Sequence, residues 1–362
     1  MRGKLIIGGF FGRGNCGDEA LLQCVYEAFS DVFDITILVD EVGAKEGFWD
    51  LYPYNESKNT HISDINIFTD KLTCGFHIGG GGLPIGVFGM HAMNAKAFNI
   101  PIAITGIEAH GIPVNNEKPT ERQKSIFNVN KHYLSLFDYV SFRNNNGIGD
   151  IEGLGSLSSN HGADWALRLE TDVNENIISD KHRAVVVVRE YELKDADAKY
   201  IQKIKDKIRM IQLAGFKPVL APFSPEDISF ANFIGISEEW PMVELWSNAR
   251  MMQQYIKESG LMISFGRLHP GIFAANVETP CAFVMPHYYF ENEDFDMKLI
   301  GMATELGITM IDNDVAFAKF LRKPRRADKN KVLLSKKRLE EQIKTLRKIF
   351  IRESKRKLQL LS

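Results

Sequence analysis

The hydrophobic residues of this chain gather in short continuous runs, which alternate with segments long enough to form helices. Continuous runs predict parallel strands covered by helices on both faces, because strands with one wet face alternate instead. The segment Lys194–Ala214 has the periodicity of a helix. The expected strands are Lys4–Gly9, Ile35–Val39, Gly75–Ile78, Ile100–Thr105, Tyr139–Arg143, Ala184–Arg189, Lys217–Ala221, Leu261–Ser264, Cys281–Met285 and Ile308–Ile311.

These strands form two groups, separated by the polar stretch Glu170–Arg183. The sequence therefore predicts an α/β protein with two doubly wound Rossmann-like domains facing a cleft, over residues 1–175 and 176–325, and a basic helix over 326–362. Ligands of open parallel sheets bind beyond the carboxyl ends of the strands. We expect the site in the cleft, on residues that directly follow strands.

Composition narrows the class of protein. The chain has 362 residues, 44% of them hydrophobic, and a net charge of -2, which excludes dominant disorder and argues against a protein whose whole surface binds nucleic acid. No apolar run is long enough to span a bilayer, and the first residues do not resemble a signal peptide. The four cysteines form no CxxC pair, so we expect reduced thiols and a cytoplasmic protein.

Positive charge is concentrated near the end of the chain. From Arg322 to Lys357 there are sixteen Lys or Arg and four Asp or Glu, a local net charge of +12. Four apolar residues recur there along one helix face: Leu339, Ile343, Leu346 and Phe350. One interpretation packs this stripe on the protein and leaves the basic face in solvent. A second adds contact with an anionic membrane, which would make the protein peripheral on its inner face. Nucleic acid is not an expected partner, because the basic residues are not interleaved with aromatic ones for stacking.

Two glycine-rich segments follow expected strands. The first is Gly8–Ala20, with the sequence GGFFGRGNCGDEA, where glycines allow close backbone approach and a helix start offers N–H groups to an anion. Within it, Asp18 or Glu19 would alternatively cap the helix. The second is Gly79–Gly82, after a strand that ends at Ile78. Its glycines allow close approach of substrate or of the other domain, or form a tight turn with no ligand.

Two arginines and a histidine follow other strands. Arg143 ends one strand, where it would grip a carboxylate or phosphate or form a structural ion pair. Arg267 and His269 are two residues apart after another strand and point the same way if the segment is extended. A cation beside a proton-exchanging imidazole suits a small anionic substrate. Their alternative roles are a surface arginine and a histidine that caps the helix in whose first turn Pro270 stands.

Together, these motifs resemble those of the polysaccharide pyruvyl transferase family. The resemblance extends from residue 5 to about residue 312, and Arg267-Leu268-His269 is its most specific element. Asn144 and Pro270 depart from the family pattern and point to an altered acceptor or shifted chemistry. The matching motifs, in order, are the N-x-G-D-E-A pattern of Asn15–Ala20, Gly79–Gly82, Arg143, Ala163–Ala166, Arg267–His269, Asp296–Lys298 and Glu305–Gly307.

The resemblance implies a GT-B-like fold and a transferase. Its reaction would move a pyruvyl group from phosphoenolpyruvate to two hydroxyls of a sugar, in a cell-surface polysaccharide or in a lipid-linked or nucleotide-linked precursor, and release phosphate. Arg143 and Arg267 would hold the anionic donor, and His269 would donate a proton. Phosphoenolpyruvate is a substrate, and neither a cofactor nor a metal is expected. The implied substrate-binding residues are Asn15, Asp18, Glu19, Gly80, Gly81, Asp164 and Leu268, and one of the three acids would orient the acceptor.

Two other functions fit the same chain. A GT-B-type glycosyltransferase would use a nucleotide sugar and would need a nucleotide site in the second domain, to which Ala221–Asp227 would belong unless it is a plain loop. A non-catalytic protein would bind glycan or lipid through the basic tail.

Overall fold

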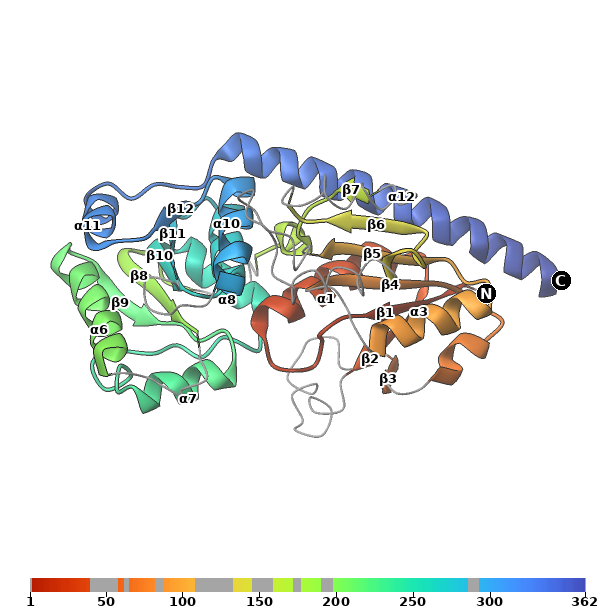
Figure 1. Ribbon diagram of the computed structural model, residues 1–362, viewed down its shortest axis with the longest axis horizontal. Helices are drawn as coiled ribbons and strands as arrows, with labels where there is room; N and C mark the ends of the chain where they lie inside the picture. The colour runs from red at the N-terminus through yellow and green to blue at the C-terminus, as the bar shows by residue number, and fades with distance from the viewer. Residues whose placement is uncertain are drawn as a thin grey trace. The chain divides into compact units, whose positions relative to one another are not determined.

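We analysed a computed structural model of the chain (Figure 1). The structure describes residues 2–39, 58–61, 65–81, 87–107, 133–144, 159–171, 177–189, 198–285 and 293–361. The chain forms two compact units. The first comprises Met1–Arg13, Asp18–Arg168 and Ser335–Ser362, and the second comprises Gly14–Gly17 and Leu169–Leu334.

The first unit is built on a parallel sheet of seven strands in the order β3-β2-β1-β4-β5-β6-β7. The strand order reverses between β1 and β4, as in a doubly wound Rossmann sheet. The strands are β1 (Lys4–Gly8), β2 (Asp34–Val39), β3 (Lys58–His61), β4 (Thr73–Gly81), β5 (Ile102–Ile107), β6 (Tyr139–Phe142) and β7 (Ser159–His161). The helices are α1 (Cys16–Phe29), η2 (Ile65–Thr69), α3 (Val87–Ala97) and η3 (Trp165–Arg168).

The second unit has a parallel sheet of five strands in the order β12-β11-β10-β8-β9, which reverses between β8 and β10. The strands are β8 (Asp180–Val188), β9 (Lys217–Leu220), β10 (Ser259–Phe265), β11 (Cys281–Val284) and β12 (Thr309–Ile311). The helices are α6 (Ala198–Leu213), α7 (Pro225–Phe233), α8 (Ala249–Lys257), α9 (His269–Asn276), α10 (Glu293–Leu306) and α11 (Asp314–Arg322).

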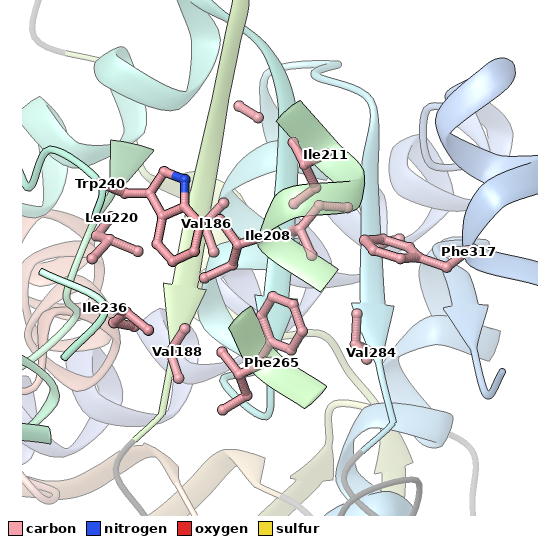
Figure 2. Close-up of a cluster of buried hydrophobic side chains, with 14 of the residues drawn as sticks. Val186, Val188, Ile208, Ile211, Leu220, Ile236, Trp240, Phe265, Val284 and Phe317 are labelled. Atoms are coloured by element: carbon pink, nitrogen blue, oxygen red, sulfur yellow. The ribbon is translucent and has the colours of Figure 1, made fainter. Parts of the chain in front are cut away.

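The core of the second unit lies between its sheet and the helices on one face (Figure 2). Val186 and Val188 of β8 are buried there beside Ile208 and Ile211 of α6. The second half of β8, Ala184–Val188, is a continuous apolar run because both of its faces are covered. The same cause makes β1, β4 and β5 apolar in the first unit, where they are buried in its core.

All ten expected strands are present, and all pair in parallel, so the predicted fold class is confirmed. The helix expected over Lys194–Ala214 is α6, of which residues before Ala198 lie outside the described part. Two strands were not expected: β3 and β7. They form the two edges of the first sheet and are short and polar.

The basic C-terminal segment forms one long helix, α12 (Lys329–Leu361), blue in Figure 1. Its predicted apolar stripe is buried, which confirms the packed interpretation: Leu339, Ile343, Leu346 and Phe350 are each at most 5% exposed. The Phe350 ring lies 6.1 Å from that of Phe29 in α1. Among the described helices, none combines the length and apolar character needed to cross a membrane.

The division into units differs in detail from the expected boundaries at 175 and 325. The break lies between Arg168 and Leu169, and the Leu169 carbonyl accepts hydrogen bonds from the side-chain amides of Gln253 and Asn276 in the second unit. Most of α12 belongs to the first unit. There Gln342 accepts a 2.6 Å hydrogen bond from the buried Ser141 hydroxyl of β6.

Candidate functional site

The strongest polar cluster of the second unit surrounds Arg267, just beyond β10. Its guanidinium forms a two-sided pair with Asp227: Nε lies 3.0 Å from Oδ2, and Nη2 lies 2.6 Å from Oδ1. Nη2 also donates to the Ser224 hydroxyl at 2.9 Å. The Asp227 side chain is 1% exposed and that of Arg267 is 14% exposed. Arg267 is therefore a fixed planar cation with one edge facing a buried carboxylate.

The partners of Arg267 stand at the start of α7, beyond β9. Ser224 caps this helix by accepting from the backbone N–H of Asp227. Asp227 in turn accepts from the backbone N–H of Phe223 at 3.1 Å. Sequence reasoning left Ala221–Asp227 open as part of a nucleotide site or a plain loop, and it singled out neither residue. The run Ser-Pro-Glu-Asp is a helix-start pattern that locates the cap, although it does not reveal the arginine.

The glycine-rich loop meets the Arg-Leu-His segment within the second unit. The Cys16 N–H donates to the Phe223 carbonyl at 2.8 Å, which ties this loop to the turn before α7. Gly14, at φ = 77°, lies against Pro225. Gly17 faces the imidazole of His269, and a Cβ at position 17 would overlap that ring. The Asn15–Ala20 motif and the Arg267–His269 motif therefore meet at Gly17 and His269.

The polar residues of this loop have distinct local roles. Asn15 is the helix cap, since its Oδ1 accepts from the Gly17 N–H at 3.1 Å, so the capping role considered for Asp18 or Glu19 falls to Asn15. Glu19 is 1% exposed, and its Oε1 accepts from the Gly12 N–H at 2.7 Å, which closes the loop. Asp18, in the first turn of α1, keeps part of its surface exposed.

His269 opens α9, the helix that follows Arg267. Leu268 precedes it with helical backbone angles and supplies no side-chain cap. Pro270 stands in the first turn, as its sequence position predicted. The Leu268 carbonyl accepts from the Gly271 N–H at 3.1 Å. Because Arg267 and His269 do not lie on a strand, the extended geometry expected from their spacing is absent.

The first unit holds the other predicted arginine. Arg143 follows β6, and its Nη1 lies 3.2 Å from Oδ2 of Asp164, which follows β7. Both side chains are at most 4% exposed. Asp164 Oδ1 accepts from the Ala166 N–H at 2.9 Å. The Asp164 carboxylate thus has both oxygens engaged within the protein, a geometry that suits a residue which orients Arg143.

The glycine run belongs to strand β4 rather than to a turn after Ile78, which corrects the expected strand end. Gly79 pairs with Thr105, and Gly81 pairs with Ile107, both in β5. A Cβ on Gly79 would lie 2.6 Å from Val25 of α1, and one on Gly80, at φ = 89°, would overlap Leu21. The close neighbour that requires these glycines is therefore helix α1. Gly82 lies outside the described residues.

The order reversals of the two sheets mark where ligands bind in doubly wound folds. In the second unit the reversal lies between β8 and β10, and the residues beyond it are Arg189 and the segment Gly266–His269. Arg189 is a further cation there, and its N–H donates to the Phe265 carbonyl at 3.1 Å. In the first unit the glycine-rich loop follows β1 at the reversal, whereas β5 separates β6 from β4.

A buried polar trio stands apart from these residues. The Thr105 hydroxyl lies 2.7 Å from Nε2 of His77 and accepts from the Trp165 indole at 2.9 Å. Complete burial lowers the pKa of His77 to about 3, so the ring is neutral at physiological pH. No group of three or more His, Cys, Asp or Glu side chains suited to a metal occurs among the described residues.

Comparison with models of known protein families identifies the family of this chain. The family model for polysaccharide pyruvyl transferases matches residues 15–288. The chain belongs to this family. The match covers Asn15–Ala20, Arg143, Asp164 and the Arg267–His269 segment, so the predicted family is confirmed, whereas the motifs Asp296–Lys298 and Glu305–Gly307 lie beyond the matched residues. A search of the curated proteins found no match.

The chain also resembles solved structures in its fold. The UDP-GlcNAc 2-epimerase of Methanocaldococcus jannaschii is 13% identical with a TM-score of 0.58, and the alignment covers 93% of this chain and 99% of that one. The UDP-N-acetylglucosamine 2-epimerase of Rickettsia bellii is 10% identical with a TM-score of 0.62, and it covers 98% of each chain. These likenesses show a GT-B-type fold. Family membership makes the chain a transferase connected with polysaccharide pyruvylation.

Proposed function

We propose that the protein transfers a pyruvyl group from phosphoenolpyruvate to two hydroxyls of a sugar, in a cell-surface polysaccharide or its precursor. The observation that supports this most is the cluster in the second unit. There, a fixed guanidinium (Arg267), an imidazole at a helix start (His269) and a glycine without a side chain (Gly17) stand together. Such a cluster offers a cation and a proton donor close together, with the imidazole packed against the glycine.

The reaction balances without an oxidant or a metal. The His269 imidazolium gives its proton to the methylene carbon of phosphoenolpyruvate, which becomes a methyl group, while a sugar hydroxyl oxygen bonds to the adjacent carbon. The carbon–oxygen bond to phosphate breaks, and phosphate leaves with the electron pair. A second hydroxyl oxygen takes its place and closes the ketal. Of the two hydroxyl protons, one restores the imidazolium and the other leaves with phosphate.

Arg267 is the proposed donor-binding residue, and Asp227 is its positioning residue. Asp227 holds one edge of the guanidinium, so the plane of the cation is set before substrate arrives. A preset cation stabilises the departing phosphate without reorganising. Arg143 is proposed as the second donor-binding cation, oriented by Asp164.

Asp18 is the proposed residue that orients the acceptor hydroxyls. Of the three acids suggested by the motifs, Glu19 is committed to the Gly12 N–H and Asp164 to Arg143. Asp18 alone among them keeps side-chain surface exposed. A partly exposed carboxylate in a first helical turn can accept a hydrogen bond from a sugar hydroxyl.

The test combines phosphate release from phosphoenolpyruvate with detection of the ketal methyl group by NMR, across lipid-linked and nucleotide-linked glycans. His269→Gln should lower turnover by about 100-fold or more, as loss of a general acid does. The exposed His182 of the same unit provides the matched control, His182→Gln, which should keep parental turnover. Near-parental turnover of the His269 variant with an unchanged unfolding midpoint would remove His269 from the reaction.

Arg267→Lys tests the donor site separately. A lysine keeps the charge but loses the fork that Asp227 and Ser224 hold, so KM for phosphoenolpyruvate should rise. An unchanged KM would remove Arg267 from donor binding. Calorimetry with phosphoenolpyruvate and with nucleotide sugars distinguishes this function from nucleotide-sugar glycosyl transfer, which requires binding of the nucleotide sugar as donor.

A further inference from the structure

Exposed apolar side chains gather at the carboxyl end of α12, in the first unit. Leu360 is 73% exposed, Leu361 is 48% exposed, and Phe98, directly after α3, is 47% exposed. All three line one groove of about 580 Å³, together with Lys71, Asn99, Glu353, Arg356 and Lys357. Single exposed apolar residues are ordinary, whereas three that share a groove from distant parts of the chain form a surface patch.

The rim of this groove, which we call the C-terminal groove, is basic. From Lys344 to Leu361 the helix carries seven Lys or Arg and one acid, Glu353. Arg356 holds that acid through two hydrogen bonds of 2.6 and 2.8 Å. Lys71 and Lys357 form no ion pair with any residue in the described part of the chain. The nearby Asp70 is paired with Lys4. Basic and apolar side chains therefore line the same groove.

The buried apolar face of α12 is not available to bind a membrane or another partner. Leu339, Leu346 and Phe350 are already covered by the first unit. Outside the groove, the exposed positions of α12 are polar or charged apart from Leu333 and Leu334 near its start, and no described helix suits a membrane-spanning role. Basic helices with a few exposed apolar residues favour the interface of an anionic bilayer, where the apolar residues reach the acyl boundary and the amines lie among phosphates.

We propose that the C-terminal groove and the adjoining end of α12 dock the protein on an anionic bilayer surface. Leu360, Leu361 and Phe98 enter the boundary between headgroups and acyl chains, and the lysines of the rim contact headgroup phosphates. Charge complementarity favours this occupant over a second copy of the chain. Two copies meeting at this groove would bring like charges together, which opposes association. The proposal is independent of the pyruvyl transfer reaction.

The experiment is co-sedimentation of the full chain with vesicles of phosphatidylcholine alone or mixed with phosphatidylglycerol. The protein should sediment with the mixed vesicles and not with phosphatidylcholine alone, and added salt should release it. Leu360→Gln/Leu361→Gln should reduce the bound fraction. The same helix supplies a matched control in Leu333→Gln/Leu334→Gln, because these leucines are 54% and 52% exposed near its other end.

Charge is tested in the same way. Lys355→Gln/Lys357→Gln should weaken partitioning about 25-fold, at about fivefold per charge near an anionic surface. Arg322→Gln/Lys323→Gln removes two exposed charges of the second unit and should leave binding unchanged. Absence of sedimentation with the mixed vesicles, or equal losses in test and control pairs at unchanged unfolding midpoints, would overturn the proposal. So would a dimer in light scattering that Leu360→Gln/Leu361→Gln dissolves, since a second copy would then cover the groove.

Discussion

Replacing Asp227 by asparagine isolates the charge that fixes Arg267. The two side chains have almost the same shape, and the amide oxygen of an asparagine can still accept the backbone hydrogen bond that Phe223 donates. What Asp227→Asn removes is the negative charge that faces Nε and Nη2 of Arg267. The guanidinium is then left without its counter-charge in a nearly closed position. The variant therefore removes the counter-charge and also turns the acceptor that faces Nη2 into an amide donor.

The size of the effect follows from burial. Breaking a fully buried ion pair costs about 3–5 kcal/mol of unfolding free energy. Arg267 is 14% exposed, which gives the stranded cation some access to water. We therefore expect about 2–4 kcal/mol for Asp227→Asn. The matched surface pair is Lys4–Asp70, with side chains 24% and 41% exposed, and Asp70→Asn should cost at most about 1 kcal/mol.

Hydrogen exchange followed by mass spectrometry is the suitable assay, because it reports each unit separately. Peptides from β8 and β10 should lose protection in Asp227→Asn, whereas peptides from β4 and β5 should not. Arg267→Gln added to Asp227→Asn should restore part of the loss, because the uncompensated charge is then gone. This account of the pair would be refuted if the unfolding free energy of Asp227→Asn lay within about 0.5 kcal/mol of the parent's. It would also be refuted if the losses of unfolding free energy from Asp227→Asn and Arg267→Gln simply added in the double variant.

Two further predictions concern buried groups. Since the pKa of His77 is lowered to about 3 by burial, the folded state binds fewer protons than the unfolded state between about pH 3 and 6.5. Stability of the first unit should therefore fall as pH drops through this range, by at most about 1.4 kcal/mol per pH unit, and His77→Gln should flatten that slope in denaturant titrations. Gly17→Ala should displace the His269 ring and lower kcat for ketal formation. Unchanged kcat in a folded Gly17 variant would show that this glycine does not shape the site.

The strands show which part of the fold the sequence can predict. Every strand buried on both faces was predicted, because burial on both sides demands a continuous apolar run. The strands β3 and β7 were missed because each is a sheet edge, where one side lacks a neighbour and polar residues such as Asn59 and Asn160 are tolerated. Each of these two strands is recognised only by its pairing with the neighbouring strand, β2 for β3 and β6 for β7.

The glycine run of β4 shows that a local pattern can signal a close approach without identifying the group that approaches. The entropy lost by ordering Gly79 and Gly80 suggested close approach of substrate or of the other domain, or else a tight turn, whereas the structure places Leu21 and Val25 of α1 against them. Residue type alone does not distinguish a ligand from a packed helix as the cause.

The site follows the same logic, with a consequence for mechanism. Sequence spacing placed Arg267 and His269 together, but Asp227 is forty residues earlier, and its role depends on β9 and β10 ending at the same sheet edge. Arg143 likewise faces Asp164. An aspartate thus largely neutralises each predicted donor-binding arginine. The two pairs would therefore orient a bound donor more than they would attract it by net charge. The proposed doubly negative donor would then need a further cation, and Arg189, which directly follows β8 at the order reversal of the second sheet, is our candidate.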